Sequence, residues 1–334
     1  MLDDRKKRIL QAIVDEYVNT AEPVSSGSIS KKKGLEYSSA TIRNEMSELE
    51  KGGYLEKTHT SSGRIPSVKG YRLYVDELLK EDNISMEEIT YIRDKLQIKA
   101  SQIEDLIKIA TNTLSEVTHY TTVAIGPKVT KQIIKEIKFI LLGNRMLMAV
   151  ILTNTGMIKE TIINFEEDIY EDQIETINLL FNSKLQGKPL EQINEPIDEY
   201  IFSEMESSAN MIRAIINQLN KVINEESKLY LEGTNKSFDL PELRKAETAK
   251  NFINILENKA EVVDLLNNEI SKDINVYIGE ELNDESLKDF SIVTLKGDDN
   301  DIGTIGIIGP KRMNYSKVIS VMRYIQKLIE KGGI

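Results

Sequence analysis

The chain has 334 residues, more than one hydrophobic core usually serves, so two or three domains are expected. It contains no cysteine, which excludes disulfides, thiolate catalysis and cysteine metal sites and gives no support for an oxidising compartment. The net charge of the whole chain, -11, argues against a nucleic-acid partner. The charge is unevenly distributed, however, because residues 1–80 hold 14 Lys and Arg against 12 Asp and Glu, whereas the remainder holds 29 against 42. Only the N-terminal segment is therefore suited to approach phosphates.

The N-terminal segment predicts three short helices. An apolar stripe over residues 9–17 follows four cations and predicts an amphipathic first helix. A serine cluster around Ser25 can cap a second short helix, and Gly34 marks a turn after it. The third helix is expected to start after Ser38 as N-cap and to end at the glycine pair 52–53. Three short helices with tight joints are typical of a helix-turn-helix.

The third helix has two different faces. Ile42, Met46 and Leu49 share one face, which is expected to be buried. The other side carries residue types that suit base edges and backbone, since Asn can pair with adenine and Arg with guanine or phosphate. The candidate DNA contacts on this helix are Ser39, Ala40, Thr41, Arg43, Asn44 and Ser47. A solvated helix surface would explain the same face.

Residues 54–66 predict two short strands joined by a polar hairpin tip. A hairpin that follows a recognition helix can lie along the DNA backbone as a wing. Its candidate donors to phosphate or to the minor groove are Lys57, His59, Thr60, Ser61, Ser62 and Arg64. A Ser and His pair can also suggest a hydrolase, but the tip supplies no orienting carboxylate or oxyanion hole, so no catalytic residue is assigned.

A long helix is predicted over residues 85–117, with Ser85 and Glu88 at capping-box spacing. A helix packed on a sheet and a coiled coil both fit its apolar stripe, although two polar positions interrupt the seam. β-rich runs between 121 and 164 are separated by hairpin signals, so an antiparallel sheet is expected to begin there.

From residue 166 to 271 the pattern is helical and acidic, with its clearest apolar face at 212–223. β-rich runs return after Lys272 and precede a helix over 315–330. A mainly helical block therefore interrupts an antiparallel-sheet domain, and the fold class is α+β. The apolar face of this block is compatible with packing in the interior of the protein and with an interface to another molecule.

Two stretches near the C-terminus look like ligand loops but lack the required spacing. The glycines of 303–309 do not follow the G-x-G-x-x-G pattern, and the carboxylates of 297–301 do not follow the alternating pattern of an EF-hand. Two histidines and no cysteine leave little material for zinc. No cofactor and no metal site is therefore assigned.

The chain resembles the heat-inducible transcription repressor family, HrcA, in three stretches: "AEPVSSGSI", "SSATIRNEMSELEKGGYLEKTHTSSGRIPSVKGYRLYVD" and "IGTIGIIGPKRMNYSKVISVMRYI". The resemblance implies a dimeric repressor with a winged-helix head, a body similar to a GAF domain and a dimerising insert in that body. It also implies binding to an inverted-repeat operator, CIRCE, ahead of chaperone operons, and dependence on the chaperonin for the active fold.

Pattern and resemblance together predict four segments. These are a winged helix-turn-helix DNA-binding domain at 1–80, the first part of a GAF-like domain at 84–165, an inserted dimerising domain at 166–271 and the second part of the GAF-like domain at 272–334. The candidate dimer contacts in the insert are Ile212, Ile215, Ile216 and Leu219.

We interpret the chain as a sequence-specific DNA-binding repressor of chaperone operons that is not an enzyme and whose partners are double-stranded operator DNA, a second copy of itself and the chaperonin. No apolar run is long enough to cross a membrane and the N-terminus does not read as a signal peptide, so a cytoplasmic location is expected. One alternative is a small-molecule-responsive regulator with its ligand in the GAF-like domain. Another is a nucleic-acid-processing enzyme, which the missing constellation of metal-binding carboxylates disfavours.

Overall fold

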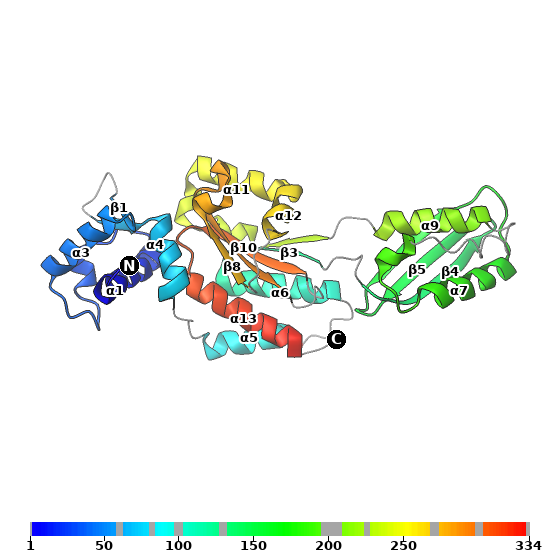
Figure 1. The fold of residues 1–334 in the computed structure, drawn as a ribbon, viewed down its shortest axis with the longest axis horizontal. Coiled ribbons are helices and arrows are strands. Elements are labelled where there is room, and N and C mark those ends of the chain that lie inside the picture. Colours follow the sequence, from blue (N-terminus) through cyan, green and yellow to red (C-terminus); the bar gives the residue numbers. More distant parts are fainter. Residues whose placement is uncertain are drawn as a thin grey trace.

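The structure is a computed structural model that describes residues 2–57, 63–79, 84–96, 103–126, 132–194, 209–223, 228–267, 274–297 and 303–331. It is elongated, and three bodies follow one another along its length (Figure 1). We call them the head (2–79), the body (84–126 and 228–331) and the insert (132–223). Helices and antiparallel sheets make an α+β fold, as the sequence predicts. Within these ranges no helix combines the length and the apolar character that a membrane span requires.

The head contains the predicted three helices and hairpin. Its elements are α1 (Asp4–Thr20), α2 (Ser26–Ile29), α3 (Ser39–Lys51), β1 (Leu55–Lys57), β2 (Arg64–Pro66), α4 (Val68–Leu73) and a π-helical turn, η1 (Tyr74–Leu78). Both predicted caps are confirmed, because Ser25 Oγ accepts from the Ser28 amide and Ser38 Oγ from the Thr41 amide, each at 3.1 Å. The stripe of α1 supplies the centre of the head core, where Ile9, Leu10, Ile13 and Val14 are fully buried.

Gly70 marks the closest approach of α4 to the turn before β1. A Cβ atom at this position would lie 2.2 Å from the carbonyl oxygen of Tyr54, which is backbone and cannot give way cheaply. We therefore expect Gly70→Ala to destabilise the protein by about 1–3 kcal/mol through overpacking. Gly27→Ala is the matched control in the same body, since its Cβ would lie 3.8 Å from its nearest neighbour, Ser25 Oγ. Equal thermal stability of the two variants would contradict the expectation.

The body is a five-stranded antiparallel sheet with helices on both faces. Its helices are α5 (Met86–Leu96), α6 (Ile103–Thr118), α10 (Thr234–Ser237), α11 (Ala246–Glu257), α12 (Lys259–Asn267) and α13 (Tyr315–Lys331), with short 3-10 turns η5 (Pro241–Arg244), η6 (Gly279–Leu282) and η7 (Glu285–Leu287). Its strands are β3 (Thr121–Ile125), β7 (Leu229–Glu232), β8 (Ile274–Ile278), β9 (Phe290–Lys296) and β10 (Thr304–Pro310), in the order β7-β3-β10-β9-β8. Figure 1 shows α6 and α13 on one side of this sheet and α11 and α12 on the other.

The predicted helix over 85–117 is two helices, α5 and α6, with 97–102 outside the described residues. Its predicted capping box is confirmed, because the Ser85 amide donates to Glu88 and the Glu88 amide donates to Ser85 Oγ. α6 packs against β3 and β7, so the interpretation as a helix on a sheet holds for this part.

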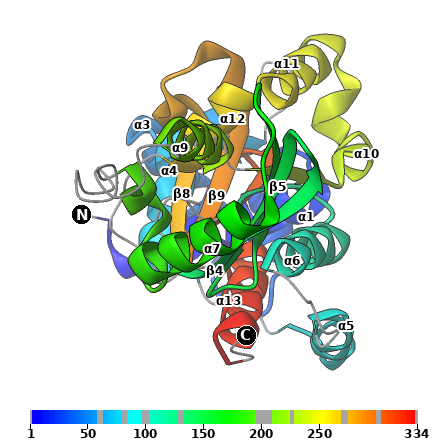
Figure 2. The same ribbon diagram turned by 90° about the vertical axis from the view of Figure 1, so that its right-hand side faces the viewer.

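The insert is a three-stranded antiparallel sheet with two helices on one face. Its elements are β4 (Ile134–Gly143), β5 (Met146–Thr153), β6 (Ile158–Asn164), α7 (Glu171–Leu185), the 3-10 turn η3 (Leu190–Asn194) and α9 (Ala209–Ile223), and the strand order is β4-β5-β6. Viewed from the insert end, α7 and α9 lie on the same side of β5 (Figure 2). Phe139 of β4 meets Phe181 of α7 edge to face at 5.0 Å, and Gln218 of α9 donates to Thr161 of β6 at 3.1 Å.

The predicted division between sheet domain and helical insert differs from the sheets of the structure. The strands of 134–164 were expected to continue the sheet that begins at 121, but they form the separate sheet of the insert. Conversely, β7 and the helices of 234–267 lie inside the block predicted as insert, yet they belong to the body. The change at 166 marks only a switch from strand to helix within one unit, because hydrophobic periodicity reports the type of element and not the sheet that a strand joins.

The candidate dimer contacts of the insert lie in its interior. Ile212, Ile215 and Leu219 are fully buried on the face of α9 that packs against β6 and η3, and Ile216 is partly buried beside them. The assignment of these four side chains to a dimer surface is therefore corrected: they are the core of the insert. An isolated amphipathic stripe gives no means of distinguishing the two environments.

Two arginines tie the head to the body, one from each side. Arg72 of α4 donates to the carbonyl oxygen of Val276 at 2.6 Å and its Nε to Glu281 at 2.8 Å. From the body, Arg312 donates to the carbonyl oxygen of Val18, at the end of α1, at 2.9 Å. Each guanidinium thus bonds to backbone across the junction, which fixes the orientation of the head on the body.

Candidate nucleic-acid interface

α3 lies at the end of the head that faces away from the body (Figure 1). Its predicted buried face is confirmed, since Ile42 and Leu49 are fully buried and Met46 is nearly so. Gly52 follows its last residue, and Gly53 takes the left-handed conformation that favours glycine, with a φ of 78°. Of the six candidates on this helix, Ser39, Ala40, Arg43 and Asn44 are exposed, whereas Thr41 and Ser47 are half-buried.

A buried carboxylate that the sequence interpretation missed anchors α3 to α1. Glu45 is 7% exposed, and its oxygens lie 2.6 Å from Arg5 and 3.4 Å from Lys6. Because a buried carboxylate is tolerated only when paired, these two cations of α1 orient α3. The sequence signal was available, since Glu45 stands three residues after Ile42 and beside Met46, on the face expected to be apolar.

The hairpin of β1 and β2 follows α3 directly. The strands pair in antiparallel register with Lys57 opposite Arg64. Lys57 is exposed and makes no ion pair with another described residue. The hairpin tip lies outside the described residues, and so do four of the candidates assigned to it: His59, Thr60, Ser61 and Ser62.

Arg64 is engaged within the head. Its Nε lies 2.7 Å from Glu50 Oε2 of α3, and its side chain is only 18% exposed. Its backbone amide and carbonyl bond to Val24 at 2.8 and 2.9 Å. The expectation that Arg64 donates to phosphate is therefore replaced by a positioning role: its side chain holds the hairpin against α3, and its backbone holds the hairpin against the segment before α2.

Most of the other cations near α3 are also neutralised. Asp3 raises the pKa of Lys6 and Glu77 that of Lys7, in each case chiefly through a hydrogen bond to the ammonium. Arg8 and Lys69 make no ion pair with a described residue but donate to the carbonyl oxygens of Gly34 and Gly52. The exposed cations of the head with neither an ion pair nor a side-chain hydrogen bond to a described residue are Lys31, Lys33, Arg43 and Lys57. The sequence interpretation missed Lys31 and Lys33, although the run of three lysines before Gly34 signals them.

The uncommitted groups therefore lie in the turn before α3, on α3 and on β1. Arg43 and Asn44 are neighbours that suit guanine and adenine edges, respectively. Lys31, Lys33 and Lys57 are free to neutralise phosphates. This combination of base-reading and phosphate-binding side chains is what a DNA-binding surface requires.

Comparison with known proteins identifies the same class. Residues 104–319 match the family model described as "HrcA protein C terminal domain". The chain is 38% identical over 338 residues to the heat-inducible transcription repressor HrcA of Ruminiclostridium cellulolyticum, covering 99% of this chain and 97% of that protein. It is 40% identical over 326 residues to the protein of the same name from Clostridium acetobutylicum, covering 96% of this chain and 94% of that protein.

A crystal structure of a hypothetical protein at 2.2 Å resolution has a similar fold, with a TM-score of 0.67, 25% sequence identity, and coverage of 99% of this chain and 98% of that one. The matches therefore extend over the head, the body and the insert together. The chain belongs to the HrcA family of heat-inducible transcription repressors, which are DNA-binding regulators and not enzymes.

Proposed function

We propose that the protein represses chaperone operons by binding a CIRCE-type inverted-repeat operator as a homodimer in the cytoplasm. The head acts as a winged helix-turn-helix, with α3 in the major groove and the hairpin along the backbone. The observation that carries this proposal is the exposure of Arg43 and Asn44, side by side, on a capped helix at the outer end of the head.

Removing one base-reading side chain is expected to reduce discrimination between operator and random DNA. Asn44→Ala or Arg43→Ala should each weaken operator binding by about 1–3 kcal/mol while leaving binding to scrambled DNA nearly unchanged. Lys57→Ala, in contrast, should weaken binding to both DNAs alike and lower the salt dependence by about one unit. Fluorescence anisotropy at several salt concentrations measures both effects.

Lys69→Ala is the control and should leave DNA binding unchanged. The ammonium of Lys69 already donates to the carbonyl oxygen of Gly52 and lies over the ring of Tyr54. Unchanged operator specificity in Asn44→Ala and Arg43→Ala would mean that a different face of the head meets the bases.

We assign the remaining functions to the body and the insert, and we take the residue limits of these two units from the sheets that they contain. The body (84–126 and 228–331) is the GAF-like domain, and the insert (132–223) carries dimerisation. Buried and exposed residues alternate along β4, β5 and β6. One face of the sheet is covered by α7 and α9, and the opposite face is mainly apolar yet exposed, which supports a dimerising role for the insert.

The outer face of the insert sheet is mainly apolar. Its central row joins Ile140, Met148 and Ile162 across the three strands. The exposed large side chains of this face are Ile140 (38%), Leu142 (46%), Met146 (40%), Ile158 (48%) and Ile162 (51%). A contiguous patch of this kind on a monomer marks an interaction surface.

Charge on this face supports a second copy as the occupant. The row next to the central one carries Lys138 on β4, Val150 on β5 and Glu160 on β6. A two-fold axis along β5 would lay β4 over the partner's β6, so that Lys138 meets the partner's Glu160, and the same contact recurs on the other side. The face is thus complementary to itself.

Edge-to-edge pairing through β4 is disfavoured. Asn178 and Asn182 of α7 bond to the free edge of this strand, each accepting from one backbone amide and donating to one carbonyl of Phe139 and Ile137 at 2.6–3.1 Å. A covered strand edge cannot add a further strand. We therefore exclude the β4 edge and assign the proposed dimer to the exposed apolar face.

We also propose that the chaperonin controls the active fraction of the protein. The topology of the body supports this, since β3 is flanked by β10 and β7, whose residues lie about 180 and about 110 positions later in the chain. Pairings of such long range form slowly and leave apolar edges exposed in the meantime.

A further inference from the structure

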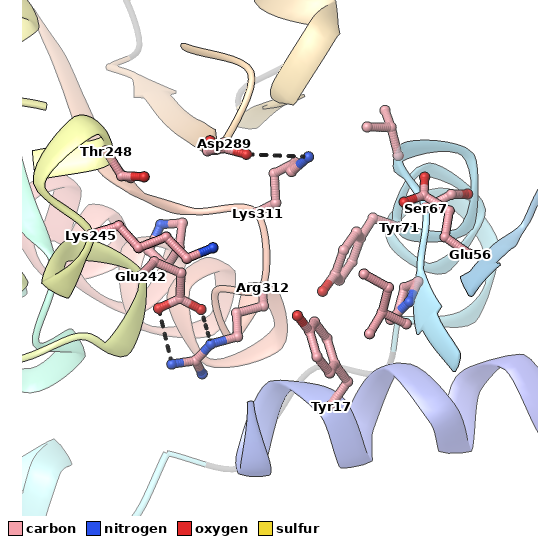
Figure 3. A pocket seen from close by; sticks show the side chains of 14 residues that line it. Tyr17, Glu56, Ser67, Tyr71, Glu242, Lys245, Thr248, Asp289, Lys311 and Arg312 are labelled. Atoms are coloured by element: carbon pink, nitrogen blue, oxygen red, sulfur yellow. Dashed lines mark hydrogen bonds and ion pairs between the residues drawn. The ribbon is translucent and has the colours of Figure 1, made fainter. Parts of the chain in front are cut away.

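A cavity of about 240 Å³ lies where the head meets the body. The head supplies side chains from α1, the hairpin and α4, and the body supplies them from η5, α11 and the segment that joins β10 to α13 (Figure 3). Since α3 contributes none of the lining, the cavity is separate from the proposed DNA surface.

The charges around the cavity are only partly paired. Arg312 holds Glu242 in an ion pair, which neutralises that carboxylate. Lys311 is held loosely, because its ammonium lies 3.9 Å from Asp289. Lys245 is exposed and makes no ion pair with any residue that the structure describes. The body therefore presents one unpaired ammonium group, Lys245, and one loosely paired one, Lys311, and the exposed carboxylates of the lining are Asp289 and, on the head side, Glu56.

The head adds a buried hydroxyl without a partner. Tyr71 is 2% exposed, and its hydroxyl has no hydrogen-bond partner in the described part of the chain. Figure 3 shows this hydroxyl and that of Tyr17 pointing toward one another on the side of the cavity that faces Arg312. Burial raises the pKa of both tyrosines, so both hydroxyls are protonated at neutral pH and can donate.

We propose that this junction cavity binds a small metabolite that carries an oxyanion, either a carboxylate or a phosphate. Lys245 and Lys311 attract the anion, and the hydroxyl of Tyr71 gains an acceptor. Apolar walls at Ile65, Pro66 and Pro310 suit the carbon part of such a molecule.

The ligand would bridge head and body, because its donors come from both. A molecule that binds only when the two bodies are together stabilises that arrangement by mass action. This inference goes beyond operator recognition, and its test contains no DNA, so its outcome is independent of the proposed repressor function.

The test titrates the full-length protein with inorganic phosphate and, separately, with malonate, against chloride at constant ionic strength. Isothermal titration calorimetry and the melting temperature are both recorded. We expect saturable binding of at least one anion together with a rise in melting temperature. Binding of phosphate alone would identify a phosphate-bearing ligand and binding of malonate alone a carboxylate-bearing one.

The variants assign the effect to the cavity. Lys245→Met and Tyr71→Phe should each weaken anion binding, the lysine change by roughly tenfold or more because it removes a charge-assisted bond. Lys250→Met is the matched control, an exposed lysine of α11, the helix that Lys245 directly precedes, outside the cavity lining. The proposal is overturned if neither anion gives a saturable response, or if Lys245→Met binds anion as tightly as Lys250→Met does.

Discussion

Replacing Met148 with aspartate is expected to convert the protein from a dimer into monomers and to lower operator affinity by roughly a hundredfold or more. Met148 stands at the centre of the outer face of the insert sheet, between Ile140 and Ile162. In the proposed dimer this side chain lies near the two-fold axis, so each interface would contain two adjacent carboxylates without partners. Sedimentation velocity measures the first effect and anisotropy with an inverted-repeat operator the second.

Leu179→Asp is the matched control for this change. Leu179 is 75% exposed on α7, on the other side of the insert, so the variant should remain dimeric and bind operator normally. The charge pair gives a second check: Lys138→Glu alone should weaken the dimer, and Lys138→Glu with Glu160→Lys should restore it. A Met148→Asp protein that sediments as a dimer would rule out this face.

The second large effect is expected in refolding. After unfolding, the protein should recover only a small fraction of its operator binding unaided, and addition of chaperonin with its nucleotide should raise that fraction several-fold. The physical reason is that both neighbours of β3 in the sheet, β7 and β10, come from distant parts of the chain. Neither edge of β3 is paired until one of these strands has reached it. An unpaired strand of which all five residues are buried in the native state is prone to aggregate.

The measurement is the concentration of operator-competent protein, obtained by stoichiometric titration with labelled operator at several temperatures of the heat-shock range. The chaperonin without nucleotide and an unrelated carrier protein serve as controls. An unchanged active fraction with the complete chaperonin system would contradict the proposal. Recovery produced instead by a small metabolite would favour the alternative of a ligand-responsive regulator.

The three helices and the hairpin strands of the head could be predicted from the sequence, because they depend on local signals, whereas α4 and η1 were not predicted. Ser25 and Ser38 cap the helices that they were expected to cap, and the glycine pair 52–53 ends α3. The burial of Glu45 was not predicted, because its partners, Arg5 and Lys6, lie on another helix, α1. Pairing between elements is information that periodicity does not contain.

The assignment of strands to sheets could not be predicted in the same way. The run at 121–125 and the run at 134–143 are both β-rich and separated by few residues, yet they join different sheets. The short strand 229–232 carries too weak a pattern to be recognised inside a helical region, although it closes one edge of the body sheet. The stripe of α9 shows the same limit, since Ile215 would look identical on a dimer surface and in a core.

The two arginine contacts across the junction between head and body have a consequence for the DNA. Because Arg72 and Arg312 hold the head to the body through backbone carbonyls, each α3 of the proposed dimer keeps a fixed position relative to the body of its own chain. In the proposed dimer, a head therefore cannot turn on its body to reach a misplaced half-site. Shifting one half-site by half a helical turn would place it on the opposite side of the duplex, where the second head cannot follow.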